Sequence, residues 1–240
     1  VCGSHLQLFG RGADAVWRYP ARDDELKCLL PFRSPLPHAA TVIRRHVLAR
    51  HSVRYDASYL HAEDYALWSQ LAQVTRFGVV PKVLYEYRRH GDNVSVRGAA
   101  RREESLRRIR AERLVELGLE PSSERIQILA LLGKAPDVVG EAALRRADAL
   151  GRELIQANER VGWYPRRTFE KVVAEAWYGL CVAHARRSFR ASEIFLRSSL
   201  SSCFPNGRRR AATLVAYWVA WRPGVSGVRG LLSRGLRAKR

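Results

Sequence analysis

The sequence lacks methionine, the residue with which a complete translation product starts. Its 240 residues begin with Val1 and contain no Met at any position. We therefore expect an N-terminally truncated chain, the later part of a longer protein, whose upstream chemistry cannot be read here. Residues 1–10 also lack the basic start and the long apolar stretch of a signal peptide.

Long apolar runs and paired cysteines are missing as well. The closest approach to a membrane-spanning segment, residues 211–221, is shorter than the roughly 18 apolar residues that such a helix needs. The four cysteines are far apart and form no Cys-x-x-Cys pair, which argues against a zinc site and gives no sign of a disulfide framework. We expect reduced thiols in a cytoplasmic protein.

Acidic residues are scarce relative to basic ones. The 42 Lys and Arg against 23 Asp and Glu give a formal net charge of +19 at pH 7. Residues 194–240 contain ten basic residues and no acid, so this tail is the expected contact for a polyanion or an anionic membrane surface. Arg outnumbers Lys by 37 to 5, as is typical of a GC-rich bacterial genome, and compositional drift is an alternative source of the charge.

The composition and the order of segments indicate a folded chain of two parts. A hydrophobic content of 47% and six Trp exclude an unstructured chain. Before Gly98, residues 15–20 and 77–91 have the pattern of strands, and residues 23–30 and 63–74 that of helices. We predict an α/β domain over residues 1–97 and a basic all-α domain over residues 98–240. The helices expected in the second domain are 99–117, 123–132, 141–158, 167–187, 191–200 and 208–221.

An acidic pair, Glu63 and Asp64, stands directly before the apolar run of the segment HAEDYALWSQLAQ. By themselves, carboxylates in a first helical turn complement the helix dipole and cap free N–H groups. The residues that recur at helical spacing behind the pair should face the core: Tyr65, Trp68, Leu71 and Ala72.

Three segments, in this order along the chain, indicate a role for the Glu63–Asp64 pair. PHAATVIRRHVL (37–48) is similar to the donor-side loop of family-2 glycosyltransferases, with a strand and an Arg pair after it. YDASYLHAEDYALWSQLA (55–72) resembles the family's aromatic-Asp, acid-pair and Leu-Trp pattern, and VLYEYRRHGDNVS (83–95) resembles its closing strand. The chain thus resembles, over roughly residues 1–97, the C-terminal half of a catalytic domain with the GT-A fold, a Rossmann-like α/β fold.

The resemblance implies transfer of a sugar, with inversion, from a nucleotide-diphosphate sugar donor to an acceptor hydroxyl. Such a transfer needs a base that takes the proton of the attacking hydroxyl, and a carboxylate within hydrogen-bond reach suffices. By the family's pattern this base is Asp64, with Glu63 orienting the loop or touching the acceptor. Family members act on glycan, lipid-linked and protein acceptors, and the resemblance does not select among them.

The resemblance also suggests residues for the donor. His38 and Thr41 fall where the family's donor loop approaches the sugar, and a purely structural role in that loop is the alternative. Arg44 or its neighbour Arg45 would line the phosphate side, since adjacent residues of a strand face opposite ways.

A divalent metal, Mn²⁺ or Mg²⁺, normally stabilises the leaving diphosphate in this family. Its principal Asp-x-Asp motif does not occur here, and we interpret the adjacent Asp23 and Asp24 as a helix cap. We expect the main ligands in the missing upstream part. His90, beside Arg88 at the end of a strand, matches the family's C-terminal His and would contact the metal or the diphosphate. The chain alone should therefore be inactive.

A second hypothesis is a basic helical module that binds nucleic acid or an acidic partner through the Arg-rich tail. No GXXG loop and no RNP-type aromatic strand accompanies that tail. We therefore favour the enzyme, without a nucleic-acid partner, in the cytoplasm or peripheral on the inner face of the cytoplasmic membrane.

Overall fold

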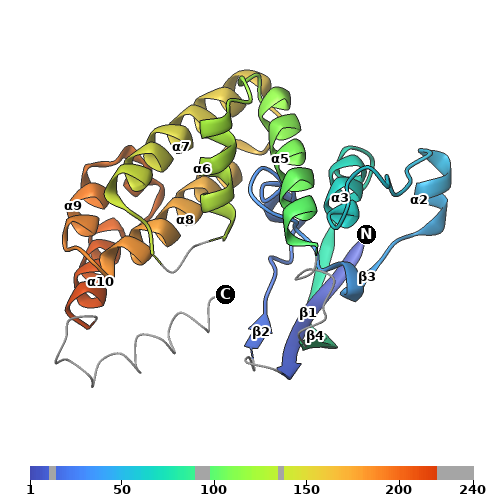
Figure 1. Ribbon diagram of the computed structural model, residues 1–240, viewed down its shortest axis with the longest axis horizontal. Coiled ribbons are helices and arrows are strands. Elements are labelled where there is room, and N and C mark those ends of the chain that lie inside the picture. Colours follow the sequence, from blue (N-terminus) through green and yellow to red (C-terminus); the bar gives the residue numbers. More distant parts are fainter. Residues whose placement is uncertain (11–14, 90–97, 135–137, 221–240) are drawn as a thin grey trace. The chain divides into compact units, whose positions relative to one another are not determined.

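The computed structural model describes residues 1–10, 15–89, 98–134 and 138–220 (Figure 1). Contacts divide the chain into two compact units, the first formed by Val1–Arg113 and the second starting at Leu114. Helix α5 (Ala99–Glu116) starts next to Gly98, and the division lies further along this helix. The chain is thus a mixed α/β fold followed by a helical part.

A four-stranded mixed sheet forms the centre of the first unit. Its middle strand is β1 (Cys2–Gly10), which pairs in parallel with β4 (Gly78–Arg89) along its whole length. The short strands β2 (Ala15–Trp17) and β3 (Thr41–Val42) pair with β1 in the antiparallel sense at different positions of its other edge. The register between β1 and β4 shifts next to His5, where β4 contains Pro81, because proline cannot donate to the sheet and favours such irregular edge positions.

The strands predicted at 15–20 and 77–91 are confirmed as β2 and β4, but the position predicted for the Arg pair is wrong. Extended pairing stops at Val42, and Arg45 is already the first residue of a short helix, α2 (Arg45–Arg50). Arg44 is the residue before that helix. Both arginines are exposed, and they do not alternate across a strand.

The predicted helices of the first unit are present as α1 (Asp23–Lys27) and α3 (Glu63–Val74). The cap interpretation is wrong for Asp23, because Arg22 is the N-cap residue and the Asp23 carboxylate instead accepts a 2.7 Å hydrogen bond from the N–H of Phe77. That bond ties α1 to the entrance of β4. The predicted inner face of α3 is confirmed: Tyr65, Trp68 and Leu71 are buried, and Ala72 is partly buried against the same core.

The second unit consists of helices around a core of its own. Its elements are α6 (Ser123–Lys134), α7 (Glu141–Val161), α8 (Arg166–Ala185), α9 (Arg190–Arg197), the 3-10 helix η2 (Ser199–Cys203) and α10 (Gly207–Ala220). Trp177 and Phe195 stack inside it with ring centroids 5.5 Å apart. Helix α7 ends at Gly162, whose φ of 72° suits glycine at this position.

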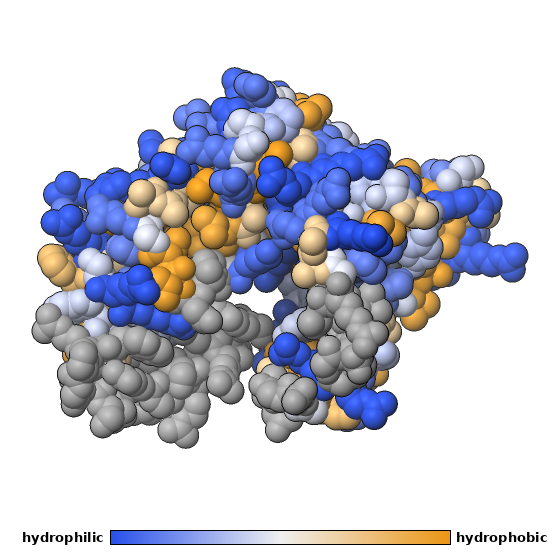
Figure 2. Space-filling view, in the orientation of Figure 1, coloured by the Kyte–Doolittle hydropathy of each residue, from blue (hydrophilic) through white to orange (hydrophobic). Residues whose placement is uncertain are grey.

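On the face drawn in Figure 2, hydrophilic residues predominate and hydrophobic ones gather in separate small groups. Among the described residues, no helix is both long enough and apolar enough to cross a membrane.

Candidate active site

Asp64 occupies the second position of α3, on a turn with an unusual backbone. His61, three residues earlier, has a φ of 60°, in the left-handed region that few non-glycine residues adopt. The Glu63 carboxylate accepts a 3.0 Å hydrogen bond from the His61 N–H. Glu63 therefore stabilises the turn at the entrance of the helix.

Helix α5 fixes the same turn from the other side. The hydroxyl of Ser105 donates to the carbonyl of Leu60 at 3.0 Å. A Cβ atom on Gly98 would lie 2.2 Å from Cδ2 of His61, so the ring of His61 rests on the glycine that precedes α5. Two further bonds add to these: Tyr59 Oη donates to Glu112 at 2.6 Å, and Arg108 donates to Ser58 at 3.0 Å. The position of Asp64 is thus determined by contacts distant in sequence.

The Asp64 carboxyl group lies in a partly buried environment. Burial raises its pKa, and a hydrogen bond from the Tyr65 N–H and the charges of His38 and Arg102 oppose this effect. A carboxylate whose pKa is raised binds a proton more readily at neutral pH. Asp64 therefore combines partial burial with a raised pKa.

His38 and two tyrosines complete what we call the Asp64 cluster: Asp64, His38, Tyr55 and Tyr19. His38, in the 3-10 helix η1 (His38–Ala40), has its Nε2 atom 2.8 Å from the hydroxyl of Tyr55. Burial raises the pKa of Tyr55, and Asp64 raises it further. Burial also raises the pKa of Tyr19 to about 12, with Asp64 again contributing. Both phenols remain protonated at neutral pH and are available as donors.

His38 and Asp64 were predicted from the sequence as site residues, whereas Tyr19 and Tyr55 were not. Tyr55 does stand in the aromatic-Asp segment, which was a usable signal. Tyr19 follows β2 and has no motif around it, so only its position in the fold places it near Asp64.

The other predicted donor residues are dispersed. The Thr41 hydroxyl donates to the Pro37 carbonyl at 2.7 Å, as in the structural alternative for this loop. Thr41 pairs with Gly3 of β1, whereas Arg88 pairs with Phe9, six positions along the strand. At about 3.3 Å per residue the two sites are roughly 20 Å apart, so the structure does not bring Arg88 to the His38 end of the sheet.

His90, the predicted metal ligand, lies outside the described residues. Within the described ranges, no three His, Cys, Asp or Glu side chains lie close enough together to hold a metal ion. These residues alone do not fit the Mn²⁺ or Mg²⁺ centre expected from the resemblance, and that centre stays a prediction.

Comparison with known proteins supports a glycosyltransferase relationship. A curated protein of Haemophilus influenzae, described as an uncharacterized glycosyltransferase, is 24% identical over 99 residues, which are 41% of this chain and 31% of that protein. The chain thus spans about a third of the length of this relative. No protein-family model matches the chain. No solved structure matches it.

Proposed function

We propose that this chain is the base-bearing part of an inverting family-2 glycosyltransferase with the GT-A fold. Its substrates would be a nucleotide-diphosphate sugar and an acceptor with a free hydroxyl, on a glycan, a lipid-linked sugar or a protein. The observation that carries the proposal is the Asp64 cluster, in which separate segments gather a partly buried carboxylate, an imidazole and two protonated phenols. The glycosyltransferase relative supports the same reaction class.

In the proposed reaction, Asp64 accepts the proton of the acceptor hydroxyl while that oxygen attacks the anomeric carbon. The bond between the anomeric carbon and the donor phosphate breaks, and the nucleoside diphosphate leaves with the electron pair. The hydrogen bond between His38 and Tyr55 holds the imidazole in place, and in the proposed reaction the imidazole orients the substrate hydroxyl. The burial that raises the pKa of Asp64 makes it a stronger base for this step.

Glu63 has a different proposed role. Its carboxylate is engaged with the His61 N–H, so it orients the turn that carries Asp64 and does not take the proton. We further propose that the donor diphosphate and its divalent metal are held mainly by upstream residues, together with His90. We propose that the exposed Arg44 or its neighbour Arg45 assists on the phosphate side.

The test is Asp64→Asn in the chain extended upstream to the start of its natural reading frame. The amide keeps the size of the side chain and removes the base, so transfer should fall on the order of 10²–10⁴-fold. Asp24→Asn is the matched control, because Asp24 pairs with Arg22 on the surface of α1 and should leave the rate unchanged. Parental transfer by the Asp64→Asn enzyme would show that this assignment is wrong.

A further inference from the structure

We propose that helices α9 and α10 form a docking face for an anionic lipid bilayer. The docking face consists of four exposed apolar side chains with arginines around them: Phe189, Leu196, Val215, Val219, and Arg197, Arg208 and Arg209. Binding of a bilayer by this face would not require sugar transfer.

Helix α10 has an apolar side where a surface helix usually has a polar one. Its buried residues Ala211, Leu214, Tyr217 and Ala220 recur at helical spacing and form the inner face. The stretch from Ala211 to Ala220 contains no charged residue, and Val215 and Val219 on the outer side are each 41% exposed. Because both sides of this stretch are apolar, its outer side is also suited to burial against an apolar partner.

Helix α9 extends the same apolar surface. Phe189, just before the helix, is 55% exposed and Leu196 is 53% exposed, and a separation of seven residues places them on one side. The Phe189 ring meets the ring of Trp218 edge to face with centroids 5.8 Å apart. The exposed aromatic side chain at the α9 entrance therefore adjoins α10 at Trp218.

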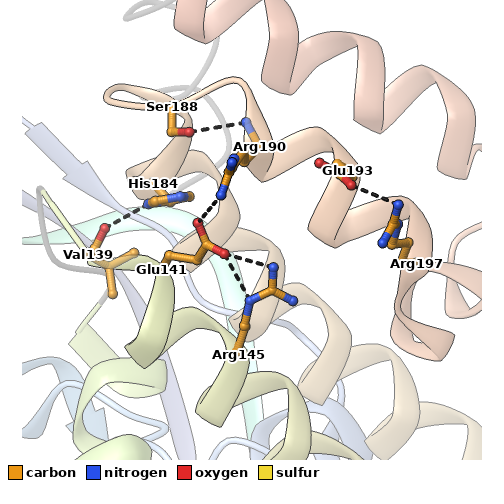
Figure 3. Close-up of polar contacts among 8 residues, drawn as sticks. All are labelled: Val139, Glu141, Arg145, His184, Ser188, Arg190, Glu193 and Arg197. Carbon is orange, nitrogen blue, oxygen red and sulfur yellow. Dashed lines mark hydrogen bonds and ion pairs between the residues drawn. The ribbon is translucent and has the colours of Figure 1, made fainter.

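The charges around this surface favour an anionic partner. Between Arg186 and Ala220 the chain contains seven arginines and one acid, Glu193. Glu193 is paired with Arg197 of the same helix at 2.9 Å (Figure 3), and the Arg197 side chain is still 79% exposed. Arg190 and Arg210 are paired with Glu141 and Glu175 of other helices, whereas Arg197, Arg208 and Arg209 are exposed.

Arg208 and Arg209 strengthen this argument, because they stand at the N-terminal end of α10. A helix dipole disfavours cations at that end, so the two arginines do not stabilise the helix itself. Their neighbour Arg210 is compensated by Glu175 at 2.6 Å. Within the described part of the chain, Arg208 and Arg209 form no ion pair, and both are exposed. An external anion would compensate them.

A bilayer fits this combination better than other occupants do. A second copy of the chain would bring two arginine-rich rims together, which is unfavourable. Nucleic acid would use the arginines and leave the exposed Val, Leu and Phe side chains uncovered. An anionic bilayer offers phosphates to the guanidinium groups and an acyl boundary to the apolar side chains. The sequence after Ala220 contains six more basic residues and no acid, and this positive charge also favours an anionic surface.

The experiment is flotation in a density gradient of the 240-residue chain with vesicles of phosphatidylcholine alone, or of phosphatidylcholine mixed with phosphatidylglycerol. Bound chain floats with the vesicles, and aggregated chain sinks. The chain should bind the mixed vesicles only, and more weakly as salt increases. Arg208→Glu with Arg209→Glu should weaken binding at least roughly tenfold, since each cation near a charged surface contributes substantially. Val215→Ser with Val219→Ser should also weaken it, with helix content unchanged by circular dichroism.

The matched control reverses two exposed arginines of α5, Arg101→Glu with Arg107→Glu, which changes the net charge by the same amount elsewhere. This control should bind as the parent does. Equal binding to neutral vesicles, no binding to either kind, or an equal loss in the control would overturn the proposal. Parental binding by the Arg208→Glu, Arg209→Glu variant would also overturn it, since the docking face would then be dispensable.

Discussion

At the scale of single residues, the ionised Asp64 carboxylate that the proposed reaction needs is unfavourable for the stability of the fold. Burial raises the pKa of its carboxyl group, so the folded chain binds the proton more tightly than the unfolded chain does. The favourable contribution of the protonated form is complete below the ordinary pKa of 3.8 and is lost as the pH rises through the folded-state pKa. At neutral pH the ionised carboxylate therefore lowers the stability of the fold.

We expect Asp64→Asn to raise the melting temperature at pH 7. The amide needs less hydration than the carboxylate, and a gain of about 1 kcal/mol would correspond to roughly 2–4 °C. The gain should shrink as the pH is lowered toward 4, where the parental carboxyl group becomes protonated. Thermal melts at several pH values measure this, with Asp24→Asn as the control that should show no gain. A lower melting temperature at pH 7 would contradict the assigned cause of the shift.

At the scale of elements, the turn before α3 depends on α5. The His61 ring occupies the space that a side chain on Gly98 would need, and the φ of His61 is in the left-handed region. The bond from Ser105 to Leu60 restrains the same turn. The entrance of α3 and the start of α5 therefore form one structural unit around Asp64.

We expect Gly98→Ala to destabilise the chain by about 1–3 kcal/mol, as overpacking of a fixed contact does. Combining it with His61→Gly should recover most of the loss, because glycine removes the ring and accepts a positive φ. Denaturant unfolding of the two single variants and the double variant measures this coupling. Gly140→Ala is the control, since no atom lies within 4 Å of a Cβ atom at that position. Additive effects in the double variant would show that the two residues do not interact.

At the scale of the whole molecule, the chain contains the proposed base but not a described site for the donor phosphates. It matches about a third of its glycosyltransferase relative, and the Asp-x-Asp motif is absent from it. Strand β4 also exposes apolar side chains, with Leu84 65% and Val83 43% exposed. Such an edge strand favours association between chains unless it is covered.

We therefore expect the 240-residue chain to catalyse neither transfer nor hydrolysis of nucleotide-sugars, and to be poorly soluble. The chain extended upstream should be active, and loss of that activity on chelation of divalent metals would support the metal requirement. Coupled detection of released nucleoside diphosphate compares the two chains under the same conditions. Measurable turnover by the shorter chain would contradict the division of the site that we propose.

Much of the architecture was predictable from sequence because helices depend on neighbouring residues. The bounds predicted for α3 match the structure, and the buried positions of Tyr65, Trp68 and Leu71 follow from spacing within one segment. The helices of the second unit were likewise predictable within a few residues. Glu63 and Asp64 could be singled out because their position before the apolar run is a local property.

Only the tertiary structure decided which residues meet. No strand was predicted over residues 2–10, yet β1 is the middle strand of the sheet. Two of its partners, β3 and β4, begin well beyond the next element of the chain. Tyr19 and Tyr55 joined His38 and Asp64, while Arg88 was placed at the other end of the sheet. Local spacing determines which face of a helix is buried, but strand pairing and the assembly of a site depend on contacts between residues far apart in the chain.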